Sequence, residues 1–145
     1  DNGEGIAADP TYQTLHGLVR AADGLVLASP VYNWGCCAEL KRFVEVVGTT
    51  PPDGSLRGAF FNKVVTFINA GGLPHSYMAV SSLAMAMMFD FKCIINPYHV
   101  YVHGRQGRDG GLVDEARDRL EKSARVMSEL MRALAQRAYR SDWEL

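Results

Sequence analysis

Two short apolar runs, each leading into a loop and then into a helical pattern, constrain the fold of this chain more than any other feature. The first run, Leu25–Ala28, precedes a helical pattern over Ala38–Val47. The second, Lys63–Asn69, leads through a glycine-rich loop to a helical pattern over Ser76–Phe89. Strands that alternate with helices form βαβ units, whose right-handed crossovers produce a parallel sheet. We therefore expect an α/β fold.

The other segments continue this alternation. A short amphipathic helix is expected over Thr11–Ala22, with Asp9 capping its start. A third strand region is expected over residues 93–102, interrupted at Asn96-Pro97, and a long amphipathic helix over about Val113–Arg140. No internal repeat or low-complexity tract divides the chain, so residues 1–145 are interpreted as a single domain.

The charge balance and the cysteines exclude several classes of function. With 15 Lys and Arg against 16 Asp and Glu, the net charge is −1, so neither nucleic acid nor an anionic membrane is an expected partner. No apolar stretch is long enough to span a bilayer. The odd count of 3 cysteines favours reduced thiols in a cytoplasmic protein.

The loops that follow the two apolar runs are the candidate binding site. In open α/β sheets, ligands bind outside the carboxyl ends of the strands, so both loops should border the same crevice. Glycines in the second loop would let the main chain approach a ligand closely, although an ordinary turn would use the same residues. The candidate residues are Pro30, Val31, Tyr32, Asn33, Trp34 and Gly35 in the first loop, and Asn69, Ala70, Gly71 and Gly72 in the second.

These residues resemble a known family. The segment Ser29-Pro30-Val31-Tyr32-Asn33, the pairs Leu40-Lys41 and Val44-Glu45 in the following helix, and the loop Asn69-Ala70-Gly71-Gly72 are similar to the NADPH-dependent FMN reductase family. The resemblance implies a flavodoxin-like fold with three αβα layers and an FMN ring lying across the two loops. Backbone groups of residues 31–34 would hydrogen-bond the ring, and the two glycines would allow close approach.

The resemblance also implies an enzyme and its reaction. Such proteins take hydride from NADPH or NADH and pass electrons to a small-molecule acceptor, namely a quinone, an azo compound, a metal oxyanion or free flavin. The cofactor carries the chemistry, so no catalytic side chain is expected. Members are usually homodimers, with the flavin near the subunit boundary, and a homotetramer is a further possibility.

One element of the family pattern has no counterpart in this sequence. The family's phosphate-binding loop is a Gly-Ser-x-Arg segment after its first strand, which would neighbour Leu25–Ala28 in the sheet. The sequence is therefore interpreted as an N-terminally incomplete version of the fold. The alternative function is a non-catalytic flavodoxin-like binding or assembly module that has lost tight FMN binding.

Several other side chains have competing interpretations. Trp34 could form a wall beside the flavin, or serve as a packing or dimer-contact residue. The spacing from Cys36 to Arg42 matches a phosphatase loop, but an acidic residue between them would repel phosphate, and buried structural thiols are the better interpretation. His99 and His103 flank a strand without an acidic or cysteine partner nearby, so no metal site is expected.

Overall fold

The sheet is built around β3 (Val64–Gly71), the apolar run that was expected to be a buried strand. In the computed structural model, which describes residues 5–50, 58–104, 106–108 and 111–137, β1 (Gly24–Tyr32) lies parallel to β3 along one edge. β4 (Ile94–Ile95) and β5 (Val100–His103) pair in turn along its other edge, also in parallel. β2 (Gly35–Cys36) pairs antiparallel with the end of β1.

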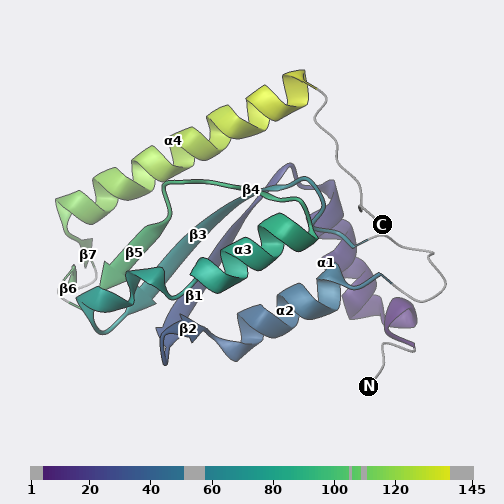
Figure 1. Cartoon of the computed structure of the whole chain (residues 1–145), viewed down its shortest axis with the longest axis horizontal. Coiled ribbons are helices and arrows are strands. Elements are labelled where there is room, and N and C mark those ends of the chain that lie inside the picture. The colour runs from purple at the N-terminus through teal and green to yellow at the C-terminus, as the bar shows by residue number, and fades with distance from the viewer. Residues whose placement is uncertain (1–4, 51–57, 105, 109–110, 138–145) are drawn as a thin grey trace.

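Helices cover both faces of this sheet (Figure 1). In the described residues they are η1 (Ile6–Ala8), α1 (Pro10–Ala21), α2 (Ala38–Gly48), η2 (Pro74–Met78), α3 (Ser81–Asp90) and α4 (Asp114–Gln136), where η marks a 3₁₀ helix. α2 and α3 lie on one side of the sheet and α4 lies on the other, while α1 lies beside α2 (Figure 1). The α/β class with three αβα layers is therefore confirmed.

The main hydrophobic core lies between the sheet and the pair α2 and α3. Alternate residues of β1 and β3 point into it, as the two-residue period of a strand requires. These strand residues pack against the apolar stripes of the two helices. The buried members from these elements include Leu27, Val65 and Phe67 from the strands, Leu40, Val44 and Val47 from α2, and Leu83 and Met87 from α3.

A buried polar cluster attaches α4 to the opposite face. The Asn96 side-chain amide donates to Thr66 Oγ1 at 2.9 Å and to the Ser123 carbonyl at 3.0 Å. Its oxygen accepts from the Tyr98 amide at 2.9 Å. Asn96 therefore occupies the expected break in the third strand region, between β4 and β5, and a paired buried amide there fixes the position of the helix.

α4 leaves part of this face open near β1. Val26 is 51% exposed and lines a hollow together with Leu120 and Met127 of α4. The outer edge of β1 over residues 24–30 has no strand partner among the described residues. In the described helices, no segment is both long enough and apolar enough to cross a membrane.

The expected helix starts and lengths are largely confirmed. The Asp9 carboxylate accepts from the amides of Thr11 and Tyr12 at 2.7 and 3.1 Å, and Pro10 occupies the first helical position. The last helix begins at Asp114 and continues to Gln136, and the expected residues 138–140 lie outside the described part of the chain.

Other boundaries were wrong because pairing between distant segments decides them. The first strand does not stop at Ala28 but continues through Pro30 to Tyr32, since it pairs with β3 as far as Pro30 opposite Ala70. Proline is tolerated there because this part of β1 is an edge strand. The expected helix Ser76–Phe89 is two elements, η2 and α3, with a break between them.

Two short antiparallel pairs were also not expected, so the sheet is not strictly parallel. One is the pair of β1 with β2, and the other joins β6 (Gly107–Arg108) to β7 (Gly111–Leu112) in the segment between β5 and α4. Strands this short carry no periodicity that the sequence could reveal.

Gly48 does not end α2 in a left-handed conformation. It is the last helical residue, and Gly5 is the only glycine of the described residues with a positive φ. A Cβ at Gly48 would lie 2.4 Å from Cζ of Phe91, so the missing side chain makes room for a core aromatic ring.

Candidate functional site

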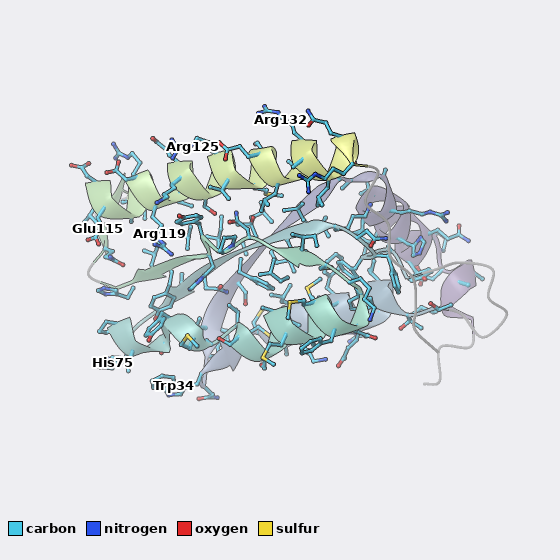
Figure 2. The ribbon with its side chains drawn as sticks, turned by 45° about the horizontal axis from the view of Figure 1, so that its top comes forward. Trp34, His75, Glu115, Arg119, Arg125 and Arg132 are labelled. Carbon is cyan, nitrogen blue, oxygen red and sulfur yellow. The ribbon has the colours of Figure 1, made fainter. Side chains whose placement is uncertain are left out.

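The parallel register of β1 and β3 brings the two predicted loops to one edge of the sheet. Ser29 lies opposite Asn69, and Pro30 lies opposite Ala70, so the segments that follow leave the sheet side by side. Figure 2 shows Trp34 and His75, which follow the two strands, at the same end of the molecule. The two segments therefore lie at the same edge of the sheet, at the carboxyl ends of their strands, as the sequence analysis expected.

The first loop is a tight β-hairpin rather than an open loop. Tyr32 pairs with Gly35, and the two residues between them have positive φ, 47° at Asn33 and 63° at Trp34. Two consecutive left-handed residues are the signature of a type I′ turn, which asparagine tolerates and tryptophan does not favour. The Tyr32 and Trp34 side chains are 63% and 61% exposed, so the turn presents two aromatic rings at the sheet edge.

Hydrogen bonds fix the ends of β1 and β3 to each other and to α2. The Asn69 side-chain amide donates to the Ser29 carbonyl at 3.2 Å, and the Ser29 hydroxyl accepts from the Cys37 amide at 3.1 Å. Asn69 is only 3% exposed, and its Oδ1 is a buried acceptor without a hydrogen-bond partner in the described structure. Such an atom is unusual because unpaired burial is unfavourable, and it points to a ligand that donates a hydrogen bond.

The two glycines of the second loop have different surroundings. A Cβ at Gly71 would lie 2.5 Å from the Tyr101 hydroxyl oxygen, so the protein's own tyrosine fills the space beside this residue. A Cβ at Gly72 would meet no atom within 4 Å, so this backbone is open to an approaching molecule.

β5 adds two residues to this edge that the sequence analysis did not place there. His103 lies opposite Gly71 in the parallel register, and its Nδ1 is buried without a hydrogen-bond partner in the described residues. The Tyr101 hydroxyl donates to the Leu73 carbonyl in the second loop. The sequence could have placed both residues at this edge, because the third parallel strand must end at the same edge as the other two.

Cys36 and Cys93 lack the electrostatic setting of reactive thiols. Burial, followed by the neighbouring Cys37, raises the pKa of Cys36, and burial raises the pKa of Cys93 to about 12. Raised values keep the thiols protonated and poorly nucleophilic, which disfavours a redox pair or a phosphatase nucleophile. Among the described residues, no three His, Cys, Asp or Glu side chains gather where they could hold a metal ion.

All the predicted site residues lie in the two segments that meet at this edge. Pro30, Tyr32 and Gly72 are exposed, Val31, Gly35 and Gly71 are half-buried, and Asn69 is buried beneath them. Ser29, Tyr101 and His103 join them as residues that were not among the predicted contacts.

Comparison with known proteins assigns the family. The sequence model of the family described as NADPH-dependent FMN reductase matches residues 2–107 of the 145. Among curated proteins, no significant match to the sequence was found.

Solved structures with this fold include several oxidoreductases. An oxidoreductase from Corynebacterium diphtheriae superposes with a TM-score of 0.68 at 17% identity, covering 85% of this chain and 63% of that protein. An NADH:FMN oxidoreductase (EMOB) in its apo form gives 0.63 at 14% identity, with 91% and 64% covered. The flavoenzyme NAD(P)H:(acceptor) oxidoreductase FerB from Paracoccus denitrificans gives 0.57 at 16%, with 89% and 68% covered.

At these identities the superpositions establish a shared fold, and the chain spans less than two thirds of the first two proteins. The family match covers most of this chain and includes both strand-end loops. The chain therefore belongs to the NADPH-dependent FMN reductase family and has its flavodoxin-like fold.

Proposed function

We propose that this chain binds FMN at the edge formed by the Tyr32 turn and the Gly71–Gly72 bend, and that it acts as an NAD(P)H-dependent oxidoreductase. The observation that carries the proposal is the register that sets Ser29 opposite Asn69 and brings both family-like loops to one edge. The family match and the flavin oxidoreductases with the same fold support it.

The residues at the edge fit a flavin. Its ring and ribityl chain carry both hydrogen-bond donors and acceptors, and Asn69 Oδ1 is a buried acceptor that lacks a donor in the described structure. The open backbone at Gly72 allows close approach, and the exposed rings of Tyr32 and Trp34 offer aromatic surface for stacking.

The protein's contribution is to bind and orient the cofactor. The chemistry that bound FMN would supply is to accept hydride and to pass electrons on. Asn69 would hold a donor of the flavin, backbone groups of residues 31–34 and 70–72 would contact its edge, and Trp34 would cover the side where substrates arrive. None of these roles requires a side-chain acid, base or nucleophile.

The donor is proposed to be NADPH or NADH, and the acceptor a quinone, an azo compound, a metal oxyanion or free flavin. The printed name of the Paracoccus denitrificans neighbour, an NAD(P)H:(acceptor) oxidoreductase, supports a small-molecule acceptor of this kind. Three free thiols support the expected reducing, cytoplasmic setting.

Turnover with added cofactor tests the proposal. The chain is titrated with FMN while flavin fluorescence is followed, and NADPH or NADH oxidation is then measured with a quinone or ferricyanide as acceptor. We expect saturable FMN binding in the micromolar range and acceptor-dependent oxidation. Absence of a flavin complex at micromolar FMN would refute the proposal.

The competing proposal is a non-catalytic binding or assembly module with the same fold. It predicts that NADPH oxidation does not exceed the rate of free FMN even when the chain is saturated with cofactor. A chain that binds FMN and does not turn over would therefore support the module.

We also propose self-association, as a homodimer or homotetramer, through α3. Met85, Met88 and Phe89 on this helix are 53%, 42% and 62% exposed, and Leu83 and Ala86 of the same helix line a groove between α3 and α2. Helices that are apolar on all sides are normally buried, so a second copy of this chain is the expected partner for this face.

A further inference from the structure

Tyr101 connects β5 to the glycine bend that follows β3. Its hydroxyl donates to the Leu73 carbonyl, which also accepts from the Ser76 amide at 3.4 Å. Because the pairing of β3 with β5 ends at Gly71 opposite His103, the bend beyond this point is not held by the sheet. The Tyr101 side chain therefore supplies a hydrogen bond between β5 and the bend.

The same side chain accounts for the glycine at position 71. A Cβ there would lie 2.5 Å from the Tyr101 hydroxyl oxygen and 3.3 Å from two of its ring carbons, Cε2 and Cζ. Contacts below 3.0 Å force one partner to move. An alanine at this position would displace the tyrosine and break its hydrogen bond to Leu73.

We propose that Tyr101 is a positioning residue that holds the Gly71–Leu73 bend in the conformation that receives FMN. This inference rests on the proposed function. A glycine-rich bend loses much conformational entropy when it is ordered, so a bend already held in place binds a ligand more tightly than a mobile one. Gly71 leaves room for the Tyr101 side chain, while Gly72 provides backbone that a ligand can approach.

The proposal makes a specific prediction about the pair of residues. Tyr101→Phe removes one neutral hydrogen bond, and FMN binding should weaken about five- to tenfold. Gly71→Ala should weaken it at least as much, because it displaces the same contact. Since both changes act on one contact, the double variant should bind no more weakly than the weaker single variant, which is a non-additive result.

FMN affinity of the 145-residue chain is measured by fluorescence titration for the parent, the two single variants and the double variant. Tyr98→Phe is the matched control, because Tyr98 packs against α4, with Lys122 Nζ 4.2 Å from its ring centre. Exchange of the amides of Gly72, Leu73, His75 and Ser76 without FMN should be faster in Tyr101→Phe than in the parent. The visible absorption band of bound FMN, compared at saturation, should also differ between the two.

Each result decides between accounts. Strictly additive losses for Gly71→Ala and Tyr101→Phe would overturn the proposal, since Gly71 would then contact the flavin independently. FMN affinity and spectrum unchanged in Tyr101→Phe, with faster exchange, would also overturn it, because the tyrosine would be merely structural. A parent chain that binds no FMN would refute the proposed function and this inference together, which is distinguishable from failure in the variants alone.

Discussion

Trp34 is the residue at which this chain departs most clearly from local preference. A bulky side chain with a φ of 63° is strained, and the second central position of a type I′ turn normally holds glycine. The ring is 61% exposed, so core packing does not explain the strain. Strain without a packing benefit is typical of functional positions, which supports a role for the ring at the cofactor edge.

We therefore expect a glycine at this position to increase stability and reduce function. Trp34→Gly relieves the backbone, whereas Trp34→Ala removes the ring and keeps the strain. Urea unfolding should show Trp34→Gly more stable than Trp34→Ala by about 1 kcal/mol. FMN-dependent NADPH oxidation should fall in both. A glycine variant that keeps full activity would show that the ring has no role at the site.

Single residues also show what the sequence could and could not predict about the site. Asn69, Gly71 and Gly72 were identifiable because they lie at or just beyond the end of a buried strand, and the sheet edge they share with Tyr32 is a consequence of parallel pairing. The sequence could not reveal the unpaired Oδ1 of Asn69 or the contact of Tyr101 with Gly71, because both depend on atomic positions across separate strands.

At the scale of elements, the packing of α2 against the end of α3 depends on one small residue. Gly48 and Phe91 are in close contact, and the ring of Phe91 also packs against Phe60, with centroids 5.4 Å apart. A glycine at the end of a helix usually indicates a left-handed cap, whereas the structure shows that Gly48 accommodates a ring. Glycine is compatible both with a helix cap and with a close contact to a ring, and only the tertiary contact with Phe91 distinguishes the two.

Replacing this glycine should overpack the core. Gly48→Ala places a methyl group 2.4 Å from Phe91, and we expect the free energy of unfolding to fall by about 1–3 kcal/mol. Gly17→Ala in α1 is the matched control, because a Cβ there meets nothing within 4 Å. In urea denaturation the control should be stabilised by up to about 1 kcal/mol. Equal effects in both helices would contradict this packing account.

The longer elements were predictable because hydrophobic periodicity extends over several turns or residues. α1, α2, α4 and β3 were found in this way, and Asp9 was recognised as a cap. β2, β6 and β7 were missed because each has two residues and depends on pairing. The break between η2 and α3 was missed because apolar residues surround that helix and give no distinct stripe.

At the scale of the molecule, the proposed subunit contact and the proposed cofactor edge lie on different parts of the fold. The exposed apolar side chains of α3 belong to a helix on one face, whereas the two loops follow the carboxyl ends of β1 and β3 (Figure 1). Disrupting the α3 face should therefore change the oligomeric state before it changes FMN binding.

A charge on this face should separate the subunits. Phe89→Glu places a carboxylate at a side chain that is 62% exposed, and sedimentation velocity should show a shift to the monomer. Leu18→Glu in α1 is the control, because Leu18 is 66% exposed outside α3 and its replacement should leave the oligomer intact. A parent chain that is already monomeric at micromolar concentration would exclude the contact.

Amide chemical shifts recorded during an FMN titration test the central claim most directly. If the flavin lies between the Tyr32 turn and the glycine bend, the largest shifts at saturation should occur at residues 31–34 and 70–73. Shifts confined to the groove between α2 and α3, with the two loops unaffected, would contradict this placement.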